Sequence, residues 1–87
     1  MNIEVEFFAS LREALGVQTI EIPASATGRI ETVQDVLEWV CSSIRGAEAS
    51  VLAAKRIRYA VNDEFVDLSC RVSAGDRVAF MPAVTGG

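Results

Sequence analysis

The sequence predicts a two-layer α+β domain, in which one amphipathic helix packs across one mixed β-sheet. The chain has 87 residues and is 51% hydrophobic, which suffices for a single domain with one modest core. Several short segments alternate between polar and apolar residues with the period of a β-strand. Only one segment has the apolar spacing of a long helix, so a single helix must cover the sheet.

The first part of the chain predicts a strand, a short helix and a second strand. Residues 3–8 alternate with a period of two, as a half-buried strand does. Ser10, with Glu13 three residues later, predicts a capping box at the start of a short helix. Gly16 is expected to end that helix, because glycine tolerates a left-handed backbone. Residues 17–22 alternate again and predict the second strand.

The main helix is predicted to begin at Thr32, after a loop at 24–29. Asp35 in its first turn and Arg45 in its last turn would both interact favourably with the helix dipole. Gly46 follows as the expected stop. The apolar stripe that should face the sheet is about three turns long and consists of Val33, Val36, Leu37, Val40 and Ile44.

The rest of the chain predicts three strands joined by tight turns. The strands are expected at 57–61, 65–68 and 77–81, with turn signals at 62–63 and 74–76. The first strand of the chain and the last one are both apolar, so both should be central, side by side and parallel. That arrangement is the β-grasp, or ubiquitin-like, fold.

Composition excludes several kinds of active site. The sequence has no histidine, which removes the commonest general base and most zinc sites. Cys41 and Cys70 lack metal-ligand spacing, so both are expected to pack as small apolar side chains. The net charge of −4 disfavours a nucleic-acid partner. The one basic cluster, at 55–58, is interpreted as the solvated start of a strand, with a docking patch as the alternative.

No secretory signal is evident at the start of the sequence. No apolar run approaches the roughly 18 residues that span a bilayer. We therefore expect a cytoplasmic protein that contacts no membrane. With so few polar groups it is a poor candidate for an enzyme on its own, and an acidic domain of this kind is steered toward basic protein surfaces.

The C-terminal segment is the most informative part of the sequence. Residues 1–81 are expected to fold as one domain, and residues 82–87 to form a flexible, extended tail that ends in Gly86-Gly87. Six extended residues reach at most about 20 Å, and glycine lets the backbone pass through a narrow channel. The reactive group would be the carboxylate of Gly87, which a partner must activate with ATP. The alternative is a frayed terminus without a role.

Three large apolar residues are out of phase with the expected core. Phe8, Phe65 and Met81 would lie on the face of the sheet opposite the main helix. Exposed apolar patches mark interaction sites, and Met81 lies at the base of the tail. The alternative is that loops 23–31 and 69–75 fold over this face and bury all three residues.

Longer stretches resemble the small subunits of molybdopterin synthase, a family of ubiquitin-like sulfur carriers. The matching segments are 6–13, 52–54, 60–62 and 75–87, so the resemblance extends over the whole chain. The last segment is the most specific, because Gly-Asp, an apolar strand, Pro and then Val-Thr-Gly-Gly are hard to obtain by chance. The sequence departs from the family at Met81, where an aromatic residue is frequent.

The resemblance implies that an E1-like enzyme uses ATP to adenylate Gly87, and that a persulfide donor then gives a thiocarboxylate. The chain would dock on a large subunit, within a heterotetramer, and insert its tail there. The sulfur would pass to the cyclic pyranopterin precursor of the molybdenum cofactor. Catalytic side chains would lie on the large subunit, and this chain would bind no cofactor or metal. The residues implied are Gly86, Thr85, Val84, Ala83 and Pro82 as tail contacts, and Phe8, Phe65 and Met81 as the docking face.

Three other interpretations stay open. One is a sulfur carrier of the same fold that serves thiamine synthesis or tRNA thiolation, although the Val-Thr-Gly-Gly ending argues against the thiamine type. Another is a protein modifier, which would need the same activated Gly87 and would form isopeptide bonds to lysine. The last is a plain interaction module with an inert tail.

Overall fold

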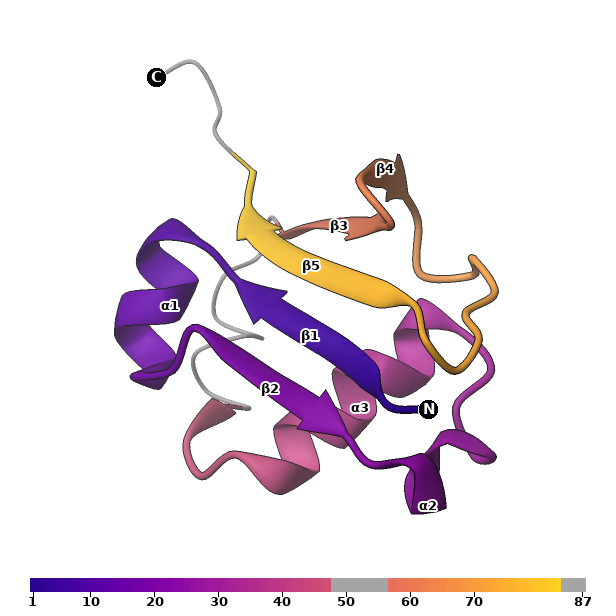
Figure 1. Cartoon of the computed structure of the whole chain (residues 1–87). Helices are drawn as coiled ribbons and strands as arrows, with labels where there is room; N and C mark the ends of the chain where they lie inside the picture. Colours follow the sequence, from indigo (N-terminus) through magenta and orange to yellow (C-terminus); the bar gives the residue numbers. More distant parts are fainter. Residues whose placement is uncertain (48–56, 84–87) are drawn as a thin grey trace.

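The computed structural model describes residues 1–47 and 57–83, which form a mixed β-sheet with one main helix across one face (Figure 1). The elements are β1 (Ile3–Phe7), α1 (Ala9–Leu15), β2 (Thr19–Ile22), α2 (Ala24–Thr27), α3 (Val33–Ser43), β3 (Ile57–Val61), β4 (Glu64–Val66) and β5 (Arg77–Pro82). Together they confirm the two-layer α+β prediction and the order of its strands. The sequence-predicted residues Val84, Thr85, Gly86 and Gly87 lie outside the described residues.

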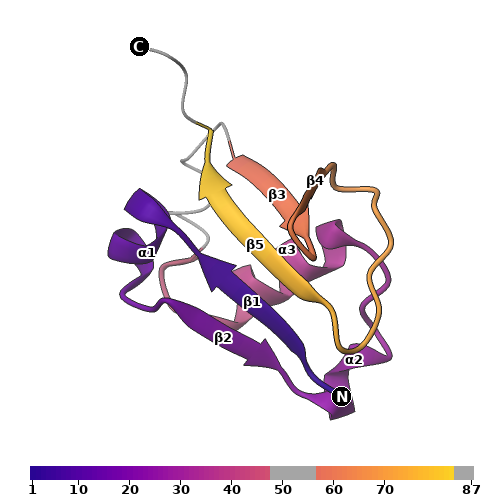
Figure 2. The same cartoon turned by 45° about the horizontal axis from the view of Figure 1, so that its top comes forward.

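The sheet has the topology that the apolar first and last strands predict. Its strand order is β2-β1-β5-β3-β4, and β1 and β5 lie side by side and parallel. Val5 pairs with Val78 across these two strands. The other neighbouring strands are antiparallel, and Figure 2 shows β2, β1, β5 and β3 in this sequence across the sheet. The described part of the chain is therefore a β-grasp domain.

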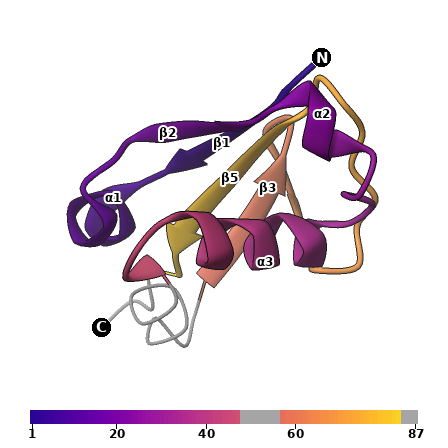
Figure 3. The same cartoon turned by 90° about the horizontal axis from the view of Figure 1, so that it is seen from below.

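The hydrophobic core lies between the sheet and α3, which crosses one face of the sheet (Figure 3). The buried sheet residues include Ile3, Val5, Phe7, Ile22, Val78 and Phe80, and the buried residues of α3 are Val33, Val36, Leu37 and Val40. The rings of Phe7 and Tyr59 meet that of Phe80 edge to face, with centroids 5.8 and 5.4 Å apart. Cys41 and Cys70 pack half-buried against this core, as expected for small apolar side chains.

Helix α3 begins where the sequence predicts and ends earlier than predicted. The Thr32 hydroxyl accepts the Asp35 N–H, and the Asp35 carboxylate accepts the Thr32 N–H, so a capping box fixes the first turn. The last helical residue is Ser43, because the β-branched Ile44 adopts an extended conformation (φ −110°, ψ 120°) while it packs against the core. Arg45 therefore lies beyond the helix, and its expected interaction with the last turn is wrong.

The capping box predicted at Ser10 is also wrong. Helix α1 begins at Ala9, its N-cap residue is Phe8, and no side chain caps it. The Phe8 N–H donates to the Phe80 carbonyl, so the chain stays in the sheet up to Phe8 and turns at Ala9 (φ +52°). The helix thus starts too early for Ser10 to cap it. Its end is as predicted, because Gly16 is left-handed (φ +74°) and its N–H donates to the Arg12 carbonyl.

Two smaller predictions are corrected. Residues 24–27 form one helical turn, α2, instead of part of a loop, and the Thr27 hydroxyl donates to the Ala24 carbonyl. Strand β4 ends at Val66 instead of residue 68, because the Asp67 carboxylate accepts the backbone N–H of Ser69 and turns the chain. The turn predicted at 62–63 is present, with both residues left-handed.

Candidate functional site

The last strand, β5, is central and runs one residue further than the predicted 77–81, so Pro82, which was expected to begin the tail, belongs to the sheet. Pro82 is the last residue of β5 and pairs with Ile57 of β3. A proline here ends the ladder, because it has no N–H to donate to a neighbour. The structure describes one residue more, Ala83, which is half-buried. The described part of the chain therefore ends beside β3, at the end of a strand that has neighbours on both sides.

The three predicted docking residues lie on the face of the sheet that α3 does not cover. Phe8 is 42% exposed and Phe65 is 58% exposed, while Met81 is half-buried. The loops that were the alternative cover for this face leave both phenylalanines accessible. Residues paired directly across strands share a face, and Phe7 pairs with Phe80, so Phe8 follows β1 beside Met81. The structure thus brings Phe8 and Met81 together at the end of β1 and β5.

Between Met81 and Phe65 lies a residue that the sequence prediction did not assign to the site. Arg58 of β3 pairs with Met81 of β5, and Ala60 of β3 pairs with Phe65 of β4. The Arg58 guanidinium carbon lies 3.9 Å from the centroid of the Phe65 ring. The signal in the sequence was the basic cluster at 55–58, which was interpreted mainly as the solvated start of a strand, with a docking patch as the alternative. We define Phe8, Met81, Arg58 and Phe65 as the docking patch.

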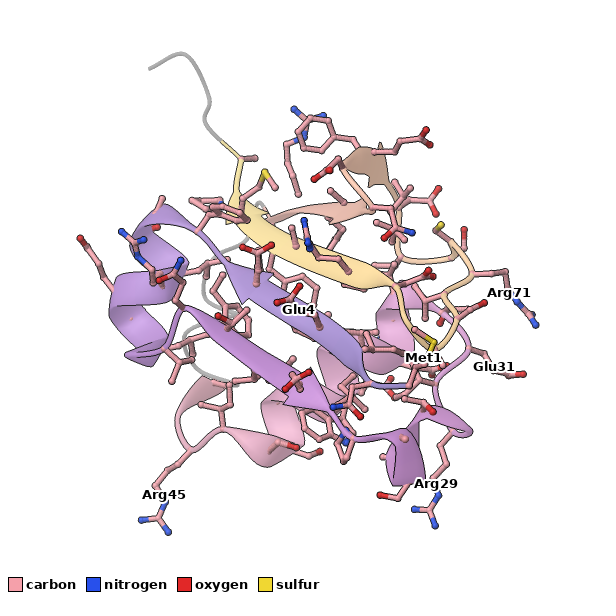
Figure 4. The ribbon with its side chains drawn as sticks, viewed as in Figure 1. Met1, Glu4, Arg29, Glu31, Arg45 and Arg71 are labelled. Atoms are coloured by element: carbon pink, nitrogen blue, oxygen red, sulfur yellow. The ribbon has the colours of Figure 1, made fainter. Side chains whose placement is uncertain are left out.

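The opposite end of the same face is charged. Arg77 Nε lies 3.0 Å from Glu4 Oε1 and 3.6 Å from Glu6 Oε1, across the parallel β1–β5 pair. The hydrogen bond to Glu4, followed by the charges of Glu4 and Glu6, raises the pKa of Arg77. Figure 4 shows Glu4 on this open face, away from the end of β5. The face is therefore largely apolar near the end of β5 and ionic at the far end.

The described residues offer little chemistry of their own. Among residues 1–47 and 57–83, no group of three or more Cys, Asp or Glu side chains is placed to hold a metal ion. No helix in these two ranges is long and apolar enough to cross a membrane. The geometry that remains is an exposed, partly apolar surface beside the end of β5.

Comparison with known proteins identifies the family. The sequence profile of the ThiS family matches residues 5–87. The chain belongs to the ThiS family. Two relatives of this ThiS-family protein are named molybdopterin synthase sulfur carrier subunit. The one from Haemophilus influenzae is 33% identical over 86 residues, 98% of this chain and 99% of the relative. The one from Escherichia coli is 36% identical, with the same coverage.

A solved structure agrees with the fold of this ThiS-family protein. The crystal structure of SAMP1 from Haloferax volcanii, a small archaeal modifier protein, superposes with a TM-score of 0.79. The two sequences are 27% identical, and the alignment covers 100% of both chains. The similarity thus extends over the whole domain and includes both proteins named as sulfur carriers and a protein named as a modifier.

Proposed function

We propose that this ThiS-family protein is the sulfur carrier subunit of a molybdopterin synthase. The observation that carries the proposal is that the family match runs through residue 87, the second glycine of the final pair. Identity of 33–36% to two carrier subunits over 98% of the chain supports it. The reactive group is the carboxylate of Gly87, which explains why the side chains of the domain need not be catalytic.

The proposed reaction begins with activation, because a carboxylate is a poor electrophile. An E1-like enzyme transfers AMP from ATP to the Gly87 carboxylate, and pyrophosphate leaves. A persulfide donor then attacks the carbonyl carbon, AMP leaves, and a thiol reduces the acyl disulfide to the thiocarboxylate. The sulfur then passes to the cyclic pyranopterin precursor. ATP binds to the activating enzyme, and the chain itself holds no cofactor or metal.

The docking patch supplies the contact with the large subunit. Phe8, Phe65 and Met81 face outward beside the end of β5, so a protein that receives the tail also covers them. The residues proposed to contact the partner's channel are Gly86, Thr85, Val84, Ala83 and Pro82. Catalytic side chains lie on the large subunit, and two copies of each subunit form a heterotetramer. This assembly belongs in the cytoplasm.

A protein modifier is the second candidate, because the 27% identical SAMP1 is named as one. Both functions need an adenylated Gly87. They differ in the nucleophile that attacks the activated Gly87 carbonyl. It is a persulfide sulfur for a carrier and a lysine amine for a modifier. A sulfur carrier for tRNA thiolation or thiamine synthesis shares the first steps and differs only in the molecule that accepts sulfur.

The test is to delete Gly87 and, separately, to add one alanine after it. The protein is incubated with ATP, the activating enzyme and a persulfide donor, and its intact mass is measured. The unchanged chain should gain the mass difference between sulfur and oxygen, and both variants should gain nothing. Both variants should unfold at the temperature of the unchanged chain, because Phe80 is the last core residue among those that the structure describes. Sulfur incorporation by the deletion variant, or only lysine-linked adducts from the unchanged chain, would contradict the proposal.

A further inference from the structure

Arg58 is the residue of the open face that the proposed function does not yet explain. It is exposed, it lies on β3 opposite Met81, and its guanidinium sits over the Phe65 ring at 3.9 Å. A polar residue in the middle of an apolar contact surface is costly to bury unless the partner satisfies it. If a partner covers this surface, the Arg58 guanidinium therefore needs a hydrogen-bond acceptor on that partner.

No carboxylate of this chain neutralises Arg58 in the part that the structure describes. The ion pairs within these residues both belong to Arg77, which Glu4 and Glu6 hold at the far end of the face. Asp67 follows β4, but its carboxylate accepts hydrogen bonds from the backbone N–H and the hydroxyl of Ser69 and forms no ion pair with Arg58. The N–H groups at the edge of the Arg58 guanidinium thus lack an acidic partner within residues 1–47 and 57–83.

Stacking on Phe65 orients the Arg58 guanidinium before any partner arrives. A guanidinium over an aromatic face is held by cation–π attraction, while its five N–H donors stay in the plane and point outward. Such a planar donor set matches a carboxylate, which it binds through two parallel hydrogen bonds. Because side-chain freedom is already reduced, less entropy is lost on binding.

The charge of the molecule makes this cation distinctive. The net charge is −4, and the ionic end of the open face places Glu4, Glu6 and Glu21 on β1 and β2. The end beside the tail presents Arg58 among Phe8, Met81 and Phe65. A partner with a carboxylate facing Arg58 gains attraction at this end only, so the pairing fixes the orientation of the docked domain and with it the direction of the tail.

We propose that Arg58 is a specificity-determining docking residue, stacked on Phe65, that receives an aspartate or glutamate carboxylate of the large subunit. This inference rests on the proposed function and adds the chemistry of the partner's surface. An open hollow of about 740 Å³ lies beside the pair, and both Arg58 and Phe65 line it. It leaves room beside the guanidinium for a side chain from the partner.

The experiment measures binding of the full chain to the large subunit of molybdopterin synthase from the same organism, at low and at raised salt. Arg58→Gln should weaken binding roughly ten-fold at low salt, and the difference should shrink as salt screens the pair. Arg58→Lys should recover only part of the affinity, because an ammonium offers no planar pair of donors. Arg71→Gln is the matched control, since Arg71 is exposed on a loop away from the docking patch (Figure 4). It removes the same charge and should change binding by less than about two-fold.

A double-mutant cycle tests the role of Phe65 as the positioning residue. In a Phe65→Leu background the apolar contact is largely kept but the stacking is lost, so the effect of Arg58→Gln should be clearly smaller than in the unchanged chain. Equal effects in the two backgrounds would overturn the positioning role. Unfolding temperatures of all variants should match, because both side chains are exposed.

The other outcomes separate this inference from the proposed function. If the unchanged chain binds and Arg58→Gln binds equally well, or if Arg71→Gln weakens binding as much, the carboxylate contact is wrong. If the unchanged chain does not bind the large subunit at all, the proposed function itself fails. A dimer of the isolated chain that sedimentation detects and Arg58→Gln abolishes would assign the surface to a second copy, and would overturn the inference.

Discussion

Tyr59 shows how one residue couples the core to the edge of the sheet. Its ring meets Phe80 edge to face at 5.4 Å, and it is half-buried beside the hollow that borders Arg58. Burial raises the pKa of the Tyr59 phenol, and electrostatic repulsion from the Cys41 thiolate, where that thiol is ionised, raises it further. The fold therefore favours the neutral phenol over the phenolate.

The first prediction concerns this titration. Tyr59 is the only tyrosine in the sequence, so the absorbance of phenolate reports its ionisation directly. Its pKa should lie above the ordinary value of about 10 in the folded protein and return to that value in urea. A raised pKa means that this contribution to stability is complete below pH about 10 and is lost as the pH rises through the folded-state pKa.

The comparison variant is Tyr59→Phe, which keeps the ring and removes the titrating group. Its unfolding free energy should fall less than that of the unchanged chain between pH 9 and pH 11, values chosen to lie on both sides of about 10. Identical pH dependence of the two proteins, or a phenol pKa at the ordinary value in the fold, would contradict the role given to burial.

At the scale of the element, the start of α3 depends on a local capping box. The Asp35 carboxylate accepts the N–H groups of Glu31 and Thr32 at 2.8 and 3.2 Å, while the Thr32 hydroxyl accepts the Asp35 N–H at 3.4 Å. These bonds satisfy donors that the first turn leaves free. They matter here because α3 is the one long helix of the described chain, and it covers the sheet.

Removal of this cap gives the second prediction. Thr32→Ala should reduce the unfolding free energy by about 1 kcal/mol, measured by urea denaturation. Ser10→Ala is the matched control, since Ser10 lies at the start of α1 without capping it, and it should change stability by less than about 0.5 kcal/mol. A loss at Ser10 as large as that at Thr32 would mean that α1 has a side-chain cap after all.

The starts of α3 and α1 also show which features the sequence could predict. The start of α3 depends on residues 32–35 alone, so the sequence predicted that start correctly, although the capping box between Thr32 and Asp35 was not among its predictions. The start of α1 depends on a hydrogen bond from Phe8 to Phe80, which joins strands at opposite ends of the chain. No local pattern contains that bond, and the predicted cap at Ser10 was wrong for this reason.

In the candidate site, too, the sequence predicted what depends on local pattern and missed what depends on pairing between strands. The period of two placed Phe8, Phe65 and Met81 on the open face, because a strand's alternation needs no knowledge of its neighbours. The stacking of Arg58 on Phe65 requires the β3–β4 register, and the ion pairs of Arg77 require the β1–β5 register. These contacts form only between paired strands, so the pattern within one strand does not predict them.

At the scale of the whole molecule, the two faces of the sheet have separate tasks. One face packs on α3 and holds the buried side chains. The other carries the docking patch, which adds little to folding because Phe8 and Phe65 stay 42% and 58% exposed. A charge placed on this face should therefore change binding and leave stability nearly intact, whereas a charge on the inner face would unfold the domain.

The third prediction uses this separation. Phe8→Asp should weaken binding to the large subunit by at least about ten-fold, because a carboxylate then replaces an apolar contact and must lose its hydration. Ala24→Asp is the matched control: it adds the same charge at an exposed position on α2, away from the end of β5 (Figure 1). Both variants should unfold within a few degrees of the unchanged chain. Binding by Phe8→Asp that equals binding by Ala24→Asp would show that the partner approaches from another side, and the open face would then lose its place in the proposed function.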